Sequence, residues 1–361
     1  MKIGILTMHK VLNYGSALQA YALQHYISKL GYDAELIDYI FPNGARKERM
    51  SLIRRIFSPL RKIMSGRLIK EQKFRQFYKD YFVCSKNRYE SPEKLAKAEL
   101  DYDIFMTGSD QVWNPQHIKD DRSFFFPFVP ENSKKISYAS SFSVAHIPEA
   151  EKAIYRDLLG SYNAISVREK SGVQIVEELT GKEAEMVCDP TLLIDKAEWS
   201  DMVKNMPKPY PEPYILAYIL RYSYDPYPEI NNIIDTVQNR LGHHLIILDG
   251  SFNDIRRKNA TVIKNAGPLE FINLVKNASF IITTSFHGTA FALNFGIPFY
   301  SVIKDRSGFD TRMTDLLDKI GCSDRAIMYN EKIFSINLSN SFGTHDFVRL
   351  SQDLLRQKIL K

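Results

Sequence analysis

Residues 2–39 read KIGILTMHKVLNYGSALQAYALQHYISKLGYDAELIDY, and this stretch decides the fold. Residues 2–8 form a nearly continuous apolar run, which is typical of a strand that is buried on both faces. Apolar residues at helical spacing follow as far as Leu30, Gly31 ends the helix, and residues 34–39 form a second strand. A strand, a helix and a strand in this order predict a βαβ unit, which opens a doubly wound parallel sheet.

The alternation of strands and helices continues along the chain in two cycles. After the opening unit, strand-like apolar runs lie at 102–108, 134–142, 163–169 and 184–193. The segment KNMPKPYPEPY at 204–214 holds four prolines and is typical of a linker. After it, strand-like runs recur at 214–220, 243–250, 278–285 and 297–303. We therefore expect an α/β protein with two Rossmann-like doubly wound domains that face a cleft.

The same pattern predicts how the chain is divided. We expect an N-terminal domain over residues 1–203, a linker over 204–213 and a C-terminal domain over 214–345. Residues 346–361 have a helical pattern and are expected to close the fold as a C-terminal helix. Between about 42 and 100 the α/β rhythm is interrupted by apolar residues at helical spacing, so we expect an inserted helical arm there.

The positive charge of the chain is concentrated in this arm. The 361 residues carry a net charge of +6, with 44% hydrophobic and 25% charged residues, as in ordinary soluble proteins. Residues 46–79 hold twelve Lys and Arg and two Glu, so this segment carries +10 and the remainder −4. We hypothesise that the arm contacts an anionic membrane surface, and a solvated helical hairpin is the alternative. Nucleic acid is not expected as a partner, because no aromatic stacking platform accompanies the charge.

Several common kinds of site lack their sequence signatures. Cys84, Cys188 and Cys322 are far apart, which argues against a disulfide framework and a zinc ribbon. The chain has no GxGxxG, P-loop, HExxH or GxSxG motif. No apolar run reaches the roughly 18 residues that span a bilayer. We expect a protein that needs no metal or cofactor and that lies in the cytoplasm, or peripherally on the inner face of the membrane.

The strongest candidate site lies in FIITTSFHGTAFALNFGIPF, residues 280–299. An apolar strand ends at Ser285, and a helix is expected to begin just after His287 and Gly288. His287 would then stand where a strand ends and a helix begins, which is where doubly wound sheets place their ligands. The first helical amides, including those of Gly288 and Thr289, would favour an anion beside a titratable imidazole. A histidine that only caps the helix is the alternative.

A second candidate site, NYGSALQ at residues 13–19, lies between the first strand and the first helix. Gly15 allows a close approach of the backbone, and Ser16 can cap the helix. Asn13 and Tyr14 would project hydrogen-bonding groups into the cleft. A turn with a purely structural role is the alternative.

A third candidate site, MTGSDQVWNP at residues 106–115, follows another predicted strand. Its Gly-Ser-Asp turn would present Asp110 at the carboxyl end of that strand. Trp113 and Asn114 are residue types that stack on a sugar and form hydrogen bonds with it. An Asx turn without a functional role is the alternative.

Arginines follow two strands of the C-terminal domain. Arg221 comes directly after the strand at 214–220, where its guanidinium could bind a phosphate or carboxylate through two hydrogen bonds. Arg306 and Arg312 follow the strand at 297–303 and would add positive charge at the same edge.

A further charged pair lies in SVREKSG, residues 166–172. Arg168 and Glu169 come at the end of another predicted strand, and we expect them to have a structural role. The histidines other than His287 show no spacing that suits a metal site.

Several of these segments, taken together and in this order, resemble the polysaccharide pyruvyl transferase family. They are NYGSALQAYAL, TGSDQVWNP, SYASSF (137–142), SVREKSG, CDPTLL (188–193) and TTSFHGTAFALNFGIPF. Each segment is short, and their combination and order over most of residues 1–320 make the resemblance specific. The resemblance is weak in the basic arm and in the C-terminal tail.

This resemblance implies a fold of the glycosyltransferase-B type, with the acceptor bound by the N-terminal domain and the donor by the C-terminal domain. It implies transfer of the enolpyruvyl unit of phosphoenolpyruvate to a hexose of a surface polysaccharide precursor, which could be lipid-linked. The usual product is a cyclic pyruvate ketal. By the same resemblance, His287 is the general acid and base, Arg221 matches an arginine of the C-terminal half, and Asp110 matches an acidic residue of the N-terminal domain.

The chain departs from the family pattern at one position. Many relatives carry an arginine two residues before the histidine, and this chain has Ser285 there. The departure removes an expected ligand of the donor's phosphate or carboxylate. Arg306, Arg312 or the helix N-terminus is expected to replace it.

Two other functions are compatible with the sequence. A nucleotide-sugar glycosyltransferase would use the same two-domain fold, but it needs a site for a base and a ribose in the C-terminal domain. A non-catalytic scaffold of a capsule assembly complex would keep the fold around a decayed site. Binding of phosphoenolpyruvate but not of UDP would distinguish a pyruvyl transferase from a nucleotide-sugar glycosyltransferase. Release of phosphate would distinguish an enzyme from a scaffold.

Overall fold

The computed structural model describes residues 1–41, 66–221, 224–250, 257–306 and 311–359. The chain divides into two compact units. The first unit comprises Met1–Lys47, Tyr78–Ile194 and His345–Lys361, and the second comprises Glu48–Phe77 and Asp195–Thr344. Each unit contains its own parallel sheet.

The first unit is built on five parallel strands in the order β3-β2-β1-β4-β5. The strands are β1 Lys2–Leu6, β2 Asp33–Tyr39, β3 Cys84–Tyr89, β4 Ile104–Thr107 and β5 Lys134–Ser137. Single bridges from Ile136 to Ala164 and from Ser140 to Val167 lead on to a short pair, β6 Ser166–Val167 and β7 Glu185–Met186. The helices are α1 Tyr14–Lys29, α4 Pro92–Ala96, α5 Pro115–Ile118, α6 Lys152–Gly160, α7 Lys170–Thr180 and α13 Thr344–Leu354. Shorter helical turns lie at Ser123–Phe125, Glu149–Glu151, Pro190–Leu192 and Leu355–Ile359.

The second unit is built on six parallel strands in the order β10-β9-β8-β11-β12-β13. The strands are β8 Tyr214–Tyr218, β9 His244–Leu248, β10 Ala260–Ile263, β11 Phe280–Thr283, β12 Phe299–Ile303 and β13 Ala326–Met328. The helices are α8 Lys196–Met202, α9 Ile230–Leu241, α10 Pro268–Lys276, α11 Phe286–Phe295 and α12 Thr311–Lys319, with a short turn at Ser323–Arg325. Helix α3, Arg67–Tyr81, contributes its first part to this unit and its last turn to the first unit.

In both units the strand order reverses at one point, between β1 and β4 in the first and between β8 and β11 in the second. The second sheet has the strand order of the Rossmann fold, and the first sheet has the same order with one strand fewer. Ligands of such sheets bind beyond the carboxyl ends of the strands at this switch point. The loops that leave β1, β4, β8 and β11 hold Asn13, Asp110, Arg221 and Ser285.

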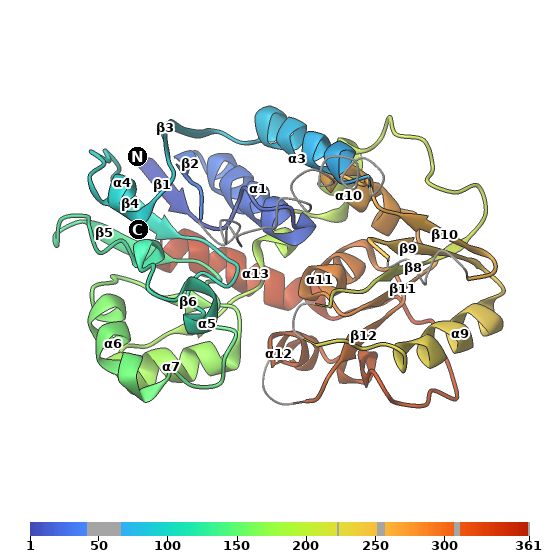
Figure 1. Cartoon of the computed structure of the whole chain (residues 1–361). Helices are drawn as coiled ribbons and strands as arrows, with labels where there is room; N and C mark the ends of the chain where they lie inside the picture. Colours follow the sequence, from blue (N-terminus) through green and yellow to red (C-terminus); the bar gives the residue numbers. More distant parts are fainter. Residues whose placement is uncertain (42–65, 222–223, 251–256, 307–310, 360–361) are drawn as a thin grey trace, which may run out of the picture. The chain divides into compact units, whose positions relative to one another are not determined.

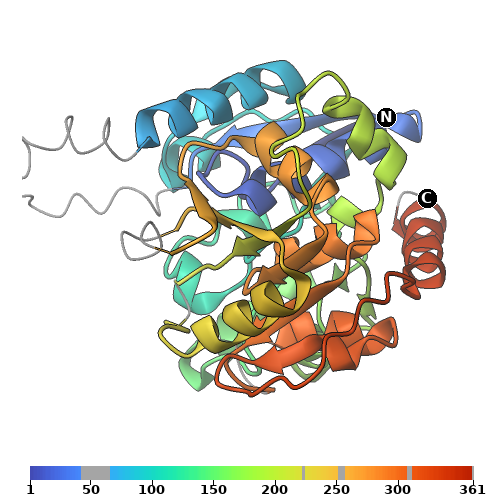
Figure 2. The same ribbon diagram turned by 90° about the vertical axis from the view of Figure 1, so that its right-hand side faces the viewer.

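Burial of apolar side chains explains why these segments form parallel sheets. The strands β4, β8 and β11 bury every residue, as expected for strands between two helical layers. In α9, Ile230, Ile233, Ile234 and Val237 recur at helical spacing and pack in one cluster with side chains of β8, β9, β11 and β12. Figure 1 shows α9 on one side of these strands and α10 on the other. The view in Figure 2, turned by 90°, shows the same arrangement.

The chain changes unit earlier than the proline-rich segment 204–213 suggests. The second unit already begins at Asp195, because Trp199 of α8 packs edge-on against Phe291 of α11, with the ring centroids 5.1 Å apart. At the other end of the chain, α13 belongs to the first unit. There the Ser351 hydroxyl accepts a hydrogen bond of 2.9 Å from the amide of Cys188.

The expected helical arm is only partly helical. Arg67–Tyr81 forms helix α3, but Cys84–Tyr89 forms β3, which pairs with β2 at the edge of the first sheet. The sequence of β3, CSKNRY, is polar and mostly exposed, as is usual for an edge strand, so it lacks the apolar run by which the other strands are recognised. The remainder of the expected arm, residues 42–65, lies outside the described residues.

Part of the positive charge of the arm is neutralised within the protein. On α3, the Lys70 ammonium lies 2.6 Å from a carboxylate oxygen of Asp249. The Lys73 ammonium lies 2.5 Å from a carboxylate oxygen of Glu270. Among the residues that the structure describes, these two lysines of the arm therefore serve the fold of the second unit.

Gly288 is needed where α11 packs against β11. A Cβ atom at this position would lie 2.4 Å from Thr283 Oγ1. That oxygen cannot move away easily, since it donates a hydrogen bond to the carbonyl of Tyr218 and accepts one from the amide of Ser285.

We predict that Gly288→Ala lowers the free energy of unfolding by about 1–3 kcal/mol, because the added methyl group overpacks the helix–strand contact. The measurement is the melting temperature, with Gly160→Ala as the control. A Cβ at Gly160 meets no atom within 4 Å, so this variant should have the melting temperature of the unmodified protein. Equal melting temperatures for the two variants would contradict the packing role of Gly288.

Candidate functional site

The second unit places His287 in the first turn of α11, directly after β11. Ser285 precedes the helix, and its hydroxyl oxygen accepts a hydrogen bond of 3.2 Å from the amide of Gly288. His287 is 7% exposed, and its ring meets the Phe286 ring edge-on with the centroids 5.4 Å apart. The imidazole therefore lies in a largely buried turn at the switch point of the second sheet.

Helix α11 begins at Phe286, before His287 rather than after Gly288 as the sequence suggests. The reason is the Ser285 cap, which uses the amides that were expected to bind an anion. Gly288 donates its amide hydrogen to the Ser285 hydroxyl, and Thr289 donates its own to the Ser285 carbonyl at 3.0 Å. Ser285, Gly288 and Thr289 thus shape the helix start, and an anion at this turn needs a ligand from a side chain.

Arg312 places a positive charge beside this turn. Its guanidinium carbon lies 6.0 Å from the centroid of the Phe286 ring, and the sulfur of its neighbour Met313 lies 3.3 Å from Thr289 Oγ1. Arg312 is 9% exposed, and its Nε atom has no hydrogen-bond partner among the residues that the structure describes. Because a buried charge is costly unless it is compensated, Arg312 is the residue at this turn best suited to bind an anion.

The other two candidate arginines already contact protein groups. Arg221 donates to both carboxylate oxygens of Asp225, through Nε at 3.0 Å and through a terminal nitrogen. Its guanidinium carbon also lies 4.8 Å from the centroid of the Tyr227 ring. The hydrogen bond from Arg221 lowers the pKa of Asp225 below its ordinary value. Arg306 is exposed and donates to the carbonyl of Ala326 at 3.1 Å.

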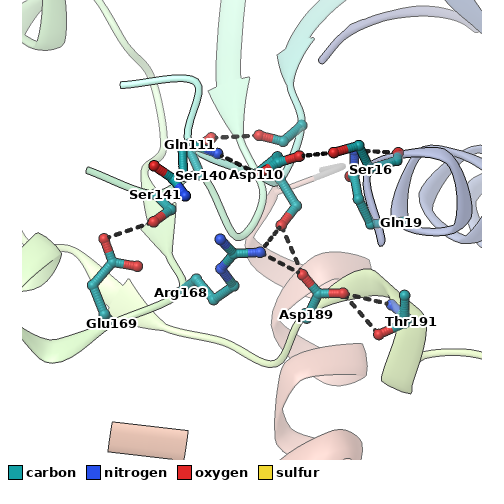
Figure 3. Close-up of polar contacts among 12 residues, drawn as sticks. Ser16, Gln19, Asp110, Gln111, Ser140, Ser141, Arg168, Glu169, Asp189 and Thr191 are labelled. Carbon is teal, nitrogen blue, oxygen red and sulfur yellow. Dashed lines mark hydrogen bonds and ion pairs between the residues drawn. The ribbon is translucent and has the colours of Figure 1, made fainter. Parts of the chain in front are cut away.

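In the first unit, Asp110 lies in the loop after β4 with a φ of +77°, a backbone conformation that is uncommon for residues other than glycine. The Ser16 hydroxyl donates to one carboxylate oxygen at 2.5 Å, and the amide of Gln111 donates to the other at 2.8 Å (Figure 3). Asn13 caps α1 by accepting a hydrogen bond of 3.2 Å from the amide of Ser16, and Gly15 is buried in the same turn. The carboxylate is therefore held at the switch point between β1 and β4.

Three residues that were expected to contact substrate serve the fold instead. Trp113 is fully buried and stacks on Phe125 with the ring centroids 5.4 Å apart, so its ring is not available to a sugar. Asn114 caps α5 through its side-chain oxygen and donates through its side-chain nitrogen to Gln111. Tyr14 is 1% exposed, so its side chain is buried. Hydrophobic packing thus decides the place of residue types that would otherwise suit sugar binding.

A second layer of buried charge lies beside Asp110 (Figure 3). Arg168 and Asp189 form an ion pair of 2.9 Å, and the side chains are 1% and 0% exposed. The Ser109 hydroxyl donates to the same Asp189 oxygen at 3.0 Å, and the amide and hydroxyl of Thr191 donate to the other oxygen. The sequence pattern did not single out Ser109, Asp189 or Thr191, because the contacts of Ser109 and Arg168 with Asp189 join segments that lie far apart along the chain. The only signal was that all three residues fall within the segments that carry the family resemblance.

A third charged cluster lies where β1 and β2 end. The Lys10 ammonium is 2.6 Å from one Asp38 oxygen, and the His9 Nε2 atom is 3.6 Å from the other. Burial by itself would raise the pKa of Asp38, but the neighbouring His9 and Lys10 side chains hold it below its ordinary range. Asp38 is therefore an ionised carboxylate at neutral pH. Sequence analysis missed this cluster too.

The cysteines do not provide a nucleophile. Burial raises the pKa of Cys84 to about 11 and that of Cys188 to about 12, and it also raises the pKa of Cys322. All three are therefore thiols at neutral pH, whereas the thiolate is the reactive form.

Comparison with known families shows to which family this chain belongs. The model of the family described as "Polysaccharide pyruvyl transferase" matches residues 13–305. This chain belongs to that family. The matched range contains both the Asp110 loop and the His287 turn. None of the curated proteins matches the sequence.

Solved structures with the same arrangement of elements confirm the fold expected for this pyruvyl transferase family member. A UDP-GlcNAc 2-epimerase from Methanocaldococcus jannaschii, in complex with UDP-GlcNAc and UDP, superposes with a TM-score of 0.51 at 13% identity, over 99% of this chain and 100% of that one. A Listeria monocytogenes protein assigned as a UDP-N-acetylglucosamine 2-epimerase gives a TM-score of 0.54 at 11% identity, over 99% and 88% of the two chains. The likeness concerns the fold, which is of the glycosyltransferase-B type.

The described part of this transferase was compared with the side-chain groups that hold metal ions and with the helices that span membranes. Within it, no group of three or more His, Cys, Asp or Glu side chains is arranged to hold a metal ion. None of the helices in the described ranges is long and apolar enough to cross a membrane.

Proposed function

We propose that this family member transfers the enolpyruvyl group of phosphoenolpyruvate to a sugar of a surface-polysaccharide precursor, forming a pyruvate ketal and releasing phosphate. The observation that carries the proposal is the buried Arg312 guanidinium beside the turn that holds His287. A compact anion with several negative charges is the ligand that such a group favours. Phosphoenolpyruvate is such an anion, and it contains the pyruvyl group that the family transfers.

The donor is proposed to bind at the start of α11. Arg312 would take the place of the arginine that many relatives carry at the position of Ser285. The helix N-terminus adds partial positive charge at the same point, because the helix dipole is positive at that end. Arg221 is the second proposed ligand, and its guanidinium becomes available when the anion displaces Asp225.

The reaction needs a group that both gives and takes protons, and we assign this role to His287. Protonation of the methylene carbon makes the neighbouring carbon electrophilic, and a sugar hydroxyl adds to it. Phosphate then leaves, and a second hydroxyl closes the ketal. Of the two hydroxyl hydrogens, one ends on the new methyl group and one on the released phosphate, so the enzyme returns to its starting protonation state. An imidazole is suited to such transfers at neutral pH.

The acceptor is proposed to bind in the first unit, through Asp110. Its carboxylate can accept a hydrogen bond from a sugar hydroxyl while Ser16 and Gln111 fix its orientation. Few but well-placed polar groups are what orient a ligand in an enzyme site. The proposed acceptor is a glycan, free or lipid-linked, that contains a hexose with two free hydroxyls.

We predict that Arg312→Gln weakens the binding of phosphoenolpyruvate by roughly 10- to 100-fold, the value of a lost hydrogen bond to a charged group. Isothermal titration calorimetry measures the dissociation constant. Arg306→Gln is the control, and it should bind within about twofold of the unmodified protein because Arg306 is exposed and bound to a carbonyl. Unchanged binding by the Arg312 variant would contradict the proposed donor site. Binding of UDP in place of phosphoenolpyruvate would instead support a nucleotide-sugar glycosyltransferase.

We predict that His287→Ala lowers the rate of phosphate release by roughly 10²- to 10⁴-fold, which is the usual contribution of a general acid or base. The assay supplies phosphoenolpyruvate with a panel of p-nitrophenyl hexosides and lipid-linked hexose glycans. The melting temperature and the affinity for phosphoenolpyruvate should stay close to those of the unmodified protein. A nearly normal rate in this variant would remove His287 from the mechanism.

We predict that Asp225→Asn strengthens phosphoenolpyruvate binding by about two- to fivefold, because it removes an exposed carboxylate that competes with the donor for Arg221. Calorimetry again measures the dissociation constant. Asp235→Asn is the matched control, since Asp235 forms a similar ion pair with Arg257 in the same unit. Weaker binding by the Asp225 variant would show that Arg221 is not a donor ligand.

A further inference from the structure

Four loops that are far apart in the sequence meet around Asp110. They follow β4, β5, β6 and β7, and the hydrogen bonds in Figure 3 connect each loop with another. We propose that the neighbouring residues Arg168 and Glu169 are positioning residues that hold Asp110 in its left-handed conformation. This inference rests on the acceptor role proposed for Asp110 above.

Glu169 fixes the loop after β5 through a single carboxylate oxygen. That oxygen accepts hydrogen bonds from the Ser141 hydroxyl at 3.0 Å, from the amide of Phe142 at 2.8 Å and from the amide of Ser143 at 3.0 Å. Ser143 itself has a positive φ of 53°, so this loop needs an outside anchor to keep its shape. Glu169 is fully buried and provides that anchor.

The anchored loop in turn holds the backbone of Asp110. The amide of Ser141 donates to the carbonyl of Asp110 at 3.0 Å, and the amide of Trp113 donates to the carbonyl of Ser141 at 3.2 Å. The two bonds fix the segment from Asp110 to Trp113 at both ends. A residue other than glycine keeps a φ of +77° only where its surroundings stabilise that conformation. These two hydrogen bonds stabilise it at Asp110.

Arg168 holds the other flank of Asp110. Its guanidinium donates to the Ser109 hydroxyl at 3.3 Å and to Asp189 at 2.9 Å, and its amide donates to the carbonyl of Ser140 at 3.2 Å. The residue before Asp110 and the loop that binds Asp110 are therefore both tied to the dipeptide at 168–169. Arg168 is 1% exposed and Glu169 0%, so both act through Asp110 rather than on a substrate.

Hydrogen exchange of the whole chain, followed by mass spectrometry, tests this positioning role without any substrate. In Glu169→Ala, we expect the amides of residues 110–113 and 141–143 to exchange at least roughly tenfold faster, because the loop loses its anchor. Glu169→Gln keeps an acceptor oxygen for the same donors and should restore slow exchange. Ser141→Ala removes one of the three bonds and should give a smaller increase, which keeps the test available if Glu169→Ala does not fold.

Gln24→Ala is the matched control for this measurement. Gln24 is also buried in the first unit, and its side chain also makes three hydrogen bonds, with the backbone of Ala34 and Val83. This variant should lose stability but leave exchange of residues 110–113 as in the unmodified protein. Unchanged exchange of these residues in Glu169→Ala, or an equal increase in Gln24→Ala, would overturn the positioning role.

A double-mutant cycle on phosphate release connects the positioning role to the reaction. Glu169→Ala should lower the rate roughly 10- to 100-fold when Asp110 is present. In the Asp110→Asn background the same substitution should lower the rate less than about twofold, because both substitutions remove the same function, the oriented carboxylate of Asp110. Equal losses in both backgrounds would mean that Glu169 acts on the rate independently of Asp110. A normal rate for Asp110→Asn alone would refute the acceptor role of Asp110, while the exchange result would still decide the positioning role.

Discussion

The start of α11 is governed by an electrostatic constraint, the compensation of a guanidinium that is nine-tenths buried. Arg312 lies over the Phe286 ring, and among the described residues its Nε has no hydrogen-bond partner. Removing a charge from water costs several kcal/mol, and an anion that enters beside the guanidinium offsets this cost. Donor affinity and local stability are therefore coupled at this turn. In the proposed function, this coupling lets the chain bind its anionic donor without an arginine at the position of Ser285.

The two units differ in where their charged side chains lie and in what these side chains contact. In the second unit, the groups proposed to bind the donor are cationic. Arg312 is buried beside the helix start, and Arg221 is paired with the exposed carboxylate of Asp225. In the first unit, the ion pair of Arg168 with Asp189 is fully internal, and it supports a backbone that is strained at Asp110. A donor with several charges needs a cationic site, whereas a neutral sugar hydroxyl needs a precisely oriented acceptor. The distribution of charge and strain over the two units agrees with the proposed donor and acceptor sites.

The sequence predicted the elements whose signal is local. Strands buried on both faces are continuous apolar runs, so the central strands of both sheets were predicted from the pattern. The alternation of strands and helices predicted that the sheets are parallel and doubly wound. The edge strand β3 could not be predicted, because CSKNRY is polar and its pairing with β2 is a tertiary contact.

The same limit applies to the candidate sites. The places of His287 and Asp110 in the fold were predicted, because each follows a predicted strand at the carboxyl edge of its sheet. The burial of Trp113 was not predictable, since a single aromatic residue does not indicate which side of a loop packs. The three partners of Glu169 lie 26 to 28 residues away in sequence, beyond the reach of any local pattern.

A crystal structure of the whole chain grown with phosphoenolpyruvate is the most direct measurement of where the donor binds. We expect its phosphate or carboxylate to lie within hydrogen-bond distance of the Arg312 guanidinium, at the start of α11. We also expect the methylene carbon to lie within about 4 Å of a His287 ring nitrogen, close enough for proton transfer. A donor bound elsewhere, with Arg312 and His287 both remote from it, would contradict the proposed chemistry.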